Sequence, residues 1–377
     1  MLNRRRFLAA CAACAAGAVL PAPLARAGGP VHKAGQPGSR PSPFSTPLPD
    51  GAAQCTLCPN ACALAEGERG RCRVRENRGG RVHTLVWGNP CAVNVDPVEK
   101  KPFFHVLPGT RSFSLATAGC NLGCLFCQNW EISQARPEDT LNYDLPPDAA
   151  VALAKRSGAA SLASTYVEPT IFMEYMLDLG RLCRAQGLLK VMHSNGYVNP
   201  GPLDALCHVL DAACIDLKGF TETYYRDMCN GSLAPVLASL RQLRARGVHL
   251  ELVNLMVPGR NDDPAEVRAM CRWVCGELGP DTPLHFTRFA PQYRLKTLPP
   301  TPQATLEAAY ATAREEGLNF VYIGNLPGHP AESTFCPDCK ALLIRRVGYS
   351  TRVEGLREGR CAACGRQVPG IWEPPAS

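Results

Sequence analysis

The chain has 377 residues and a formal net charge of +7; 46% of its residues are hydrophobic and 19% are charged. This length and apolar content are sufficient for two or three folded units with a sizeable core. Because the positive charge is modest and is not gathered into long Lys or Arg runs, the composition predicts no nucleic-acid partner.

Residues 1–27 have the pattern of an export signal. Twin arginines precede an Ala-rich apolar run that ends at Ala25-Arg26-Ala27, a small-residue cleavage pattern. The pattern is typical of twin-arginine signals, and the run is too short to span a membrane. We therefore expect export to the periplasm; the alternative is a fortuitous Ala-rich start and a cytoplasmic protein. Residues 28–50 are rich in proline and glycine and predict a linker.

The first of three cysteine sets follows in residues 51–95, which we interpret as a Cys-rich N-terminal module. Four thiols suit a closed metal site, and the spacing fits zinc and a second 4Fe–4S cluster equally well. The expected ligands are Cys55, Cys58, Cys62 and Cys72.

Strand and helix patterns alternate from residue 111 to residue 324. The predicted strands are 111–118, 160–166, 188–195, 212–218, 249–257, 283–289 and 319–324, and the predicted helices are 148–157, 170–186, 202–209, 233–246, 264–276 and 301–316. Such alternation indicates parallel strands with crossover helices. We predict an α/β fold, a partial (β/α)6 TIM-like barrel over residues 96–325, with its chemistry at the carboxyl ends of the strands.

The second cysteine set directly follows the first predicted strand of this barrel, in "AGCNLGCLFCQNW". Thiolates are soft ligands that hold iron–sulfur clusters. Three thiolates, Cys120, Cys124 and Cys127, leave one iron of a 4Fe–4S cluster without a protein ligand, and that iron is free to bind a substrate or cofactor. The alternative is a zinc knuckle or buried cysteines.

The third set lies in residues 326–377, where two C-x2-C turns flank a β-rich stretch. Four thiolates in paired turns predict a zinc-ribbon-like module with a closed structural site. The alternative is a second cluster or a single iron. We expect this tail to act as a structural lid on the barrel, with the ligands Cys336, Cys339, Cys361 and Cys364.

Nearly the whole chain resembles the AmmeMemoRadiSam-system radical S-adenosylmethionine (SAM) enzymes, which are related to the pyruvate formate-lyase-activating enzymes. The resemblance rests on motifs in a fixed order, including "CTLCPNAC", "DPVEKKPFF", "AGCNLGCLFCQNW", "HSNGYVNP" and "IDLKGF". It implies a radical SAM barrel whose three-cysteine cluster reductively cleaves SAM to a 5′-deoxyadenosyl radical for hydrogen abstraction. The protein then supplies no catalytic group of its own, because the radical is generated on SAM.

The resemblance also implies which residues contact SAM. It assigns the cluster to Cys120, Cys124 and Cys127, sets the backbone of Phe126 against the adenine, and directs Glu168 to the SAM amino group. Lys218 becomes a partner of the SAM carboxylate. The other expected contacts are Asn195 and Gly196 near the ribose or methionyl end, Asp216 beside Lys218, and Asn254 and His285, which we expect to end their strands and close the site.

Structural roles for these residues stay open at this point. A Glu or Lys at a strand end often belongs to a solvated rim or an ion pair, and His285, flanked by apolar residues, also fits a core histidine.

The expected partners are SAM, a reductant such as flavodoxin or ferredoxin, and a protein substrate that the enzyme activates. The alternative function is a non-catalytic multi-cluster iron–sulfur electron carrier. The export signal conflicts with the cytoplasmic origin of SAM.

Overall fold

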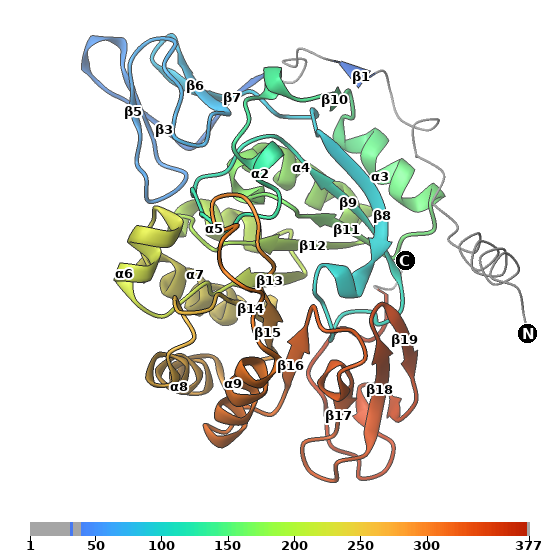
Figure 1. Ribbon diagram of the computed structural model, residues 1–377. Coiled ribbons are helices and arrows are strands. Elements are labelled where there is room, and N and C mark those ends of the chain that lie inside the picture. The colour runs from blue at the N-terminus through green and yellow to red at the C-terminus, as the bar shows by residue number, and fades with distance from the viewer. Residues whose placement is uncertain (1–30, 33–38, 375–377) are drawn as a thin grey trace, which may run out of the picture.

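The computed structural model describes residues 31–32 and 39–374. The predicted signal, residues 1–27, lies outside the described residues. The central feature of the described chain is an eight-stranded sheet (Figure 1). Its strands are β8 (Ala92–Pro97), β9 (Arg111–Ala116), β11 (Ser161–Ser164), β12 (Leu189–Ser194), β13 (Ala212–Asp216), β14 (His249–Met256), β15 (Leu284–Arg288) and β16 (Val321–Gly324).

Strand β9 and strands β11 to β16 are parallel and lie in chain order across the sheet, while β8 pairs antiparallel with β9 at one edge. The connecting helices are α3 (Pro147–Arg156), α4 (Met173–Ala185), α5 (Pro200–Cys207), α7 (Ala234–Ala245), α8 (Pro264–Trp273) and α9 (Gln303–Glu315). The predicted α/β fold with a parallel sheet is confirmed. Its closure as a six-unit partial barrel stays a prediction.

Local sequence explains where the crossover helices begin and end. Asp263 caps α8 by accepting hydrogen bonds from the backbone N–H groups of Ala265 and Glu266. Helix α4 stops ahead of Gly187, whose φ of 65° lets the chain reverse into β12. Shorter pieces are α2 (Trp130–Ser133), α6 (Glu222–Tyr224) and the π-helical segments η7 (Tyr225–Cys229) and η8 (Val274–Leu278).

The two faces of the sheet are buried differently. One face packs against the helices in the main hydrophobic core. The other face contributes Ala163, Val191, Cys214 and Val253 to a second core, which segment 103–106 completes. The backbone N–H groups of Phe104 and His105 each donate to the carboxylate of Glu251 on β14. Segment 103–106 therefore closes the amino-terminal end of the sheet.

Two small antiparallel sheets form the N-terminal module. They are β3-β4-β5 and β2-β7-β6, built from β2 (Arg40–Pro41), β3 (Ser45–Pro47), β4 (Ala53–Cys55), β5 (Ala63–Leu64), β6 (Arg75–Arg78) and β7 (Arg81–Thr84). Strands β2 and β3 lie inside residues 28–50, so the prediction of a linker is wrong for that part of the segment. The prolines of this segment do not exclude strands, because proline is tolerated in edge strands. The predicted boundary at 95/96 falls inside β8. Strand β1 (Val31–His32) pairs with β10 (Asn142–Tyr143).

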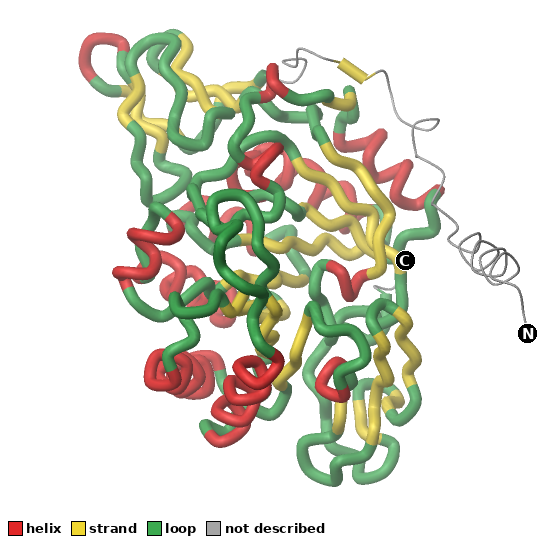
Figure 2. Tube along the Cα trace, in the orientation of Figure 1, coloured by secondary structure: helices red, strands yellow, loops and turns green. Residues whose placement is uncertain are grey.

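The C-terminal module contains the sheet β17-β18-β19 and the hairpin β20-β21. Its core is shared with Phe104, Phe320 and Tyr322, at the amino ends of the central strands. Figure 2 shows the small N-terminal sheets and this module at opposite ends of the molecule. The strands are β17 (Thr334–Phe335), β18 (Leu342–Val347), β19 (Ser350–Val353), β20 (Leu356–Arg357) and β21 (Arg360–Cys361).

This position corrects the expectation of a lid. Because the module covers the amino ends of the strands, it does not cover the cysteine loop at their carboxyl ends. Among the described residues, no helix has the length and apolar content needed to cross a membrane.

Candidate active site

The cysteine loop leaves the carboxyl end of β9 and runs to α2. Cys124 is buried, and Cys120 and Cys127 are half-buried. The loop is held against η7, because Gly123 N–H donates to the carbonyl of Cys229 and Leu125 N–H donates to that of Met228. The predicted position, directly after a parallel strand, is confirmed.

Each of the three thiols has polar neighbours. The hydroxyl of Ser133 lies 3.2 Å from Cys127 Sγ, and the amide of Asn195 lies 3.9 Å from Cys120 Sγ. A hydrogen bond from Cys229 and the positive charge of Lys218 lower the pKa of Cys124, against the effect of burial. Donors and a cation around three thiols fit a negatively charged thiolate-bound group.

These three thiols are not among the described groups that are compact enough to hold a single metal ion. Within the described part of the chain, one group of three or more potential ligands has all its ligand atoms within 4.8 Å of one another, and it is the C-terminal cysteine set. The Cys120 loop is therefore more open than a mononuclear thiolate site, in which Zn–S bonds of about 2.3 Å put the sulfurs about 3.8 Å apart.

A charged group stands beside the loop at the carboxyl end of β13. Asp216 binds Lys218 Nζ at 2.8 Å with one oxygen and His193 Nε2 at 2.7 Å with the other. Burial opposes ionisation of Asp216, but Lys218 and His193 hold the pKa of Asp216 well below its usual range. Burial likewise opposes the charge on Lys218, but Asp216 and Cys124 raise its pKa, so Lys218 stays positive. Its ammonium lies 5.7 Å from the ring of Phe126.

Glu168 ties the ends of β11 and β12 together. Its carboxylate accepts hydrogen bonds from Thr170 N–H, the hydroxyl of Ser194 and, at 2.7 Å, Asn195 N–H. Asn195 in turn donates to Asn121 Oδ1 at 2.9 Å, next to Cys120. Gly196 follows with a φ of 68°. The described bonds of Glu168 thus position the loop that carries Asn195 and Gly196, and its predicted contact with the SAM amino group stays a prediction.

Two predicted contacts lie elsewhere. His285 is the second residue of β15, near the amino end, where its ring N–H donates to Glu251 Oε2 at 2.8 Å and its ring stacks on Tyr322. The core-histidine alternative holds for it. Asn254 faces helix α8: its amide donates to the carbonyl of Leu217 at 2.7 Å and lies 3.6 Å from Met270 Sδ. Period-two alternation places both residues in a strand but does not tell which end or which face they occupy.

The structure also brings in residues that the sequence reading missed. Cys229, which is not among the expected ligands, lies in hydrogen-bond contact with Cys124. A second polar group joins Asp96 of β8 to the side chains of Lys101 and Tyr166. Tyr166 has a φ of 66° and its carbonyl accepts a 2.6 Å hydrogen bond from Asn129, just after the cysteine loop. The only sequence signal was the charged motif "DPVEKK", because the contact between Asp96 and Tyr166 joins residues 70 positions apart in the sequence.

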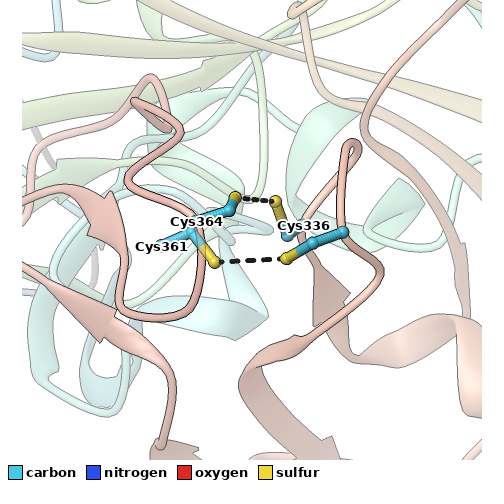
Figure 3. Close-up of side chains that lie close together, drawn as sticks. Cys336, Cys361 and Cys364 are labelled. Carbon is cyan, nitrogen blue, oxygen red and sulfur yellow. Dashed lines mark hydrogen bonds between the residues drawn. The ribbon is translucent and has the colours of Figure 1, made fainter.

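The C-terminal cysteines form a compact four-thiol group (Figure 3). Cys336 Sγ lies 3.5 Å from Cys364 Sγ, and Cys339 Sγ lies 3.6 Å from Cys361 Sγ. These distances match the edge of a tetrahedral thiolate site. The predicted convergence of this set is confirmed; the set is able to bind one metal ion.

The N-terminal module packs directly on the cysteine loop. The amide of Asn60 donates to the carbonyl of Asn121 at 2.8 Å, and Arg71 donates to the carbonyl of Asn230 at 3.1 Å. Asn199, after β12, donates to the carbonyl of Thr56. This module, rather than the C-terminal one, therefore covers the carboxyl ends of the strands.

Gly119→Ala should disrupt the packing of the N-terminal module on the cysteine loop. Gly119 has a φ of 92°, and a Cβ there would lie 2.4 Å from the carbonyl oxygen of Cys72 and 2.7 Å from Val74. Because a backbone oxygen cannot move aside like a side chain, we expect a loss of unfolding free energy on the order of 3 kcal/mol or more. Denaturant titration measures it. Gly201→Ala, on α5 with open space around it, is the matched control, and equal stability of the two variants would contradict the contact.

Comparisons with known proteins agree with this site. The sequence model of the radical SAM superfamily matches residues 114–274. An uncharacterised protein of Methanocaldococcus jannaschii is 42% identical over 327 residues, which cover 86% of this chain and 97% of that protein. The pyruvate formate-lyase 1-activating enzyme of Escherichia coli K12 is 24% identical over 161 residues, or 41% of this chain and 65% of that enzyme.

Among solved structures, a domain of the pyruvate-formate lyase-activating enzyme from Bacteroides vulgatus matches 41% of this chain and 91% of that domain, with 14% identity and a TM-score of 0.37. The sequence matches and the three-cysteine loop at the end of a parallel strand thus lead to one conclusion: the chain belongs to the radical SAM superfamily, in one family with the Methanocaldococcus jannaschii protein and homologous to the pyruvate formate-lyase activating enzymes.

Proposed function

We propose that this protein is an AmmeMemoRadiSam-system radical SAM enzyme that cleaves SAM reductively. The superfamily implies a 4Fe–4S cluster and SAM, and Cys120, Cys124 and Cys127 would hold that cluster. When bound, it supplies the electron that converts SAM into methionine and a 5′-deoxyadenosyl radical, which abstracts hydrogen. The observation that carries the proposal is the open three-thiol loop with the Asp216–Lys218–His193 group beside it.

The side chains around the loop bind and orient rather than react. Lys218 stays protonated, is nearly buried and lies close to Cys124, so it offers a fixed positive charge to the carboxylate of SAM. Phe126 is buried and directly precedes Cys127, and it offers its backbone to the adenine. Glu168 positions Asn195 and Gly196 toward the same space. Burial of these groups keeps water away from the reacting atoms.

The substrate of the radical is proposed to be a partner protein, and the electron donor a flavodoxin or ferredoxin. Homology to the pyruvate formate-lyase activating enzymes supports this class of substrate. For the C-terminal set we propose a structural zinc ion, because four thiolates with sulfurs 3.5 and 3.6 Å apart suit a closed tetrahedral site.

Anaerobic incubation of the reduced full-length protein with SAM tests the central claim. We expect 5′-deoxyadenosine and methionine in equal amounts, measured by liquid chromatography and mass spectrometry. A non-catalytic electron carrier would take up the electron without forming either product, so absence of both products would reject the enzyme in favour of that alternative.

Lys218→Ala should weaken SAM binding by about tenfold or more. A charge-assisted contact contributes roughly 1.5–3 kcal/mol, and about 1.4 kcal/mol corresponds to a factor of ten. Isothermal titration of the cluster-loaded protein with SAM measures the change, while the absorbance of the cluster stays intact. Lys155→Ala removes the same charge from an exposed helix position and serves as the control. Wild-type affinity in the Lys218 variant would show that SAM binds elsewhere.

A further inference from the structure

The four N-terminal thiols face one enclosed cavity. Its lining includes Cys55, Cys58, Cys62 and Cys72, which come from β4 and from two turns, together with Arg75 and Ile171. The four thiols converge on this space from an 18-residue stretch, residues 55–72. The arrangement is that of a ligand set around a space.

The spacing of this set differs from that of the C-terminal set. Among the described residues, the four C-terminal sulfurs lie within 4.8 Å of one another and the four N-terminal sulfurs do not. The N-terminal set shares this wider spacing with the Cys120 loop. In this superfamily, that loop binds a 4Fe–4S cluster. In its spacing, the N-terminal set resembles the proposed cluster site and differs from the proposed zinc site.

Donors at the cavity wall suit a negatively charged cluster. Backbone N–H groups of Asn60 and Val74 donate to Cys58 and Cys72. Arg75 is fully buried at the wall; its two Nη atoms bind Glu174, Ser42 and the carbonyl of Ile171. Its Nε is buried and has no hydrogen-bond partner among the described atoms. A buried N–H normally finds an acceptor, and a cluster sulfide or thiolate in this cavity would provide it.

One layer of residues separates this cavity from the Cys120 loop. Gly119, which precedes Cys120, lies against the carbonyl of Cys72 and against Val74 and Ile171. Ile171 also lines the cavity. The two thiol sets are therefore neighbours across a buried, apolar contact, whereas the C-terminal module that carries the third set lies at the opposite end of the molecule (Figure 1).

We propose that Cys55, Cys58, Cys62 and Cys72 hold a second 4Fe–4S cluster, fully ligated by protein, and that it exchanges single electrons with the cluster at the Cys120 loop. Four soft thiolates suit both zinc and an iron–sulfur cluster, and their wide spacing favours the cluster. In one transfer, an external low-potential one-electron donor is oxidised, the N-terminal cluster is reduced, and the same electron passes on to the Cys120 site; no bond to protein forms or breaks. The proposed electron exchange rests on the proposed function, whereas the proposed N-terminal cluster does not.

Metal analysis of the anaerobically reconstituted full-length protein tests the cluster. We expect about eight irons and eight acid-labile sulfides per chain, with zinc confined to one ion. The double variant Cys58→Ser/Cys62→Ser and the single variant Cys124→Ser should each retain about four irons. Cys207→Ser, at a half-exposed helix position, is the control and should keep all eight. Wild-type protein with about four irons and two zinc ions would overturn the proposal, whether or not the double variant folds.

The same experiment distinguishes the inference from the proposed function. Eight irons without SAM cleavage would reject the enzyme and leave the second cluster standing. SAM cleavage by a protein with only four irons, all of which are lost in Cys124→Ser, would support the enzyme and reject the second cluster.

Electron paramagnetic resonance of the reduced protein tests whether the two clusters lie close to each other. In the wild type, magnetic interaction between two close reduced clusters should broaden or split both signals. Each variant that retains one cluster should give a narrow, isolated signal. A wild-type spectrum equal to the sum of the two variant spectra would overturn the electron-exchange part.

Discussion

Cys124→Ala is expected to abolish the reductive cleavage of SAM, with a loss of at least about 10³-fold, or about 4 kcal/mol of barrier. Cys124 is the buried member of the three-thiol loop and stands next to Lys218 and Cys229. Two remaining thiolates cannot hold a cluster with one defined open iron, so both SAM binding and electron delivery fail together. The yield of 5′-deoxyadenosine after anaerobic reduction measures the loss.

The control for this prediction is Cys183→Ala, which removes another buried thiol from helix α4, away from the loop. It should retain full 5′-deoxyadenosine yield. Because Cys229 touches Cys124, the double variant Cys124→Ala/Cys229→Ala shows whether the second thiol substitutes for the first. An unchanged yield in both Cys124 variants would remove the cluster from this loop altogether.

Cys361→Ser is expected to lower the unfolding free energy by on the order of 5 kcal/mol or more, because metal binding at a thiolate site is coupled to folding. Cys336 and Cys361 are buried in the core that the C-terminal module shares with Phe104 and Tyr322. Loss of one ligand leaves three thiols without the ion and opens that core at the amino ends of the strands. Denaturant titration of the full-length protein measures the stability, and native mass spectrometry measures the bound metal.

Val347→Ser is the matched control, since Val347 is an exposed residue of the same module and contributes little burial. We expect near wild-type stability and one zinc ion in that variant. Iron in place of zinc in the wild type would instead make the C-terminal set a redox site. Unchanged stability after loss of the metal would show that the shared apolar core alone holds the module.

Positions of the seven parallel strands and of the six crossover helices between them followed from the sequence to within a few residues, because periodicity and capping are local properties. Strand β8 did not: its six residues carry mixed polar and apolar side chains, and its place at the sheet edge depends on pairing with β9. The small strands β2 and β3 were hidden by proline, which edge strands accept.

The sequence by itself determined the three cysteine sets, the parallel sheet and the Asp216–Lys218 pair, since each depends on spacing within one loop or one strand end. Tertiary structure alone decided that His285 pairs with Glu251 at the amino ends of the strands and that Asn254 faces helix α8. It also decided that the N-terminal module, not the C-terminal one, covers the cysteine loop. The physical reason is that these contacts join segments distant in sequence, so their geometry depends on how whole elements pack, which local periodicity does not encode.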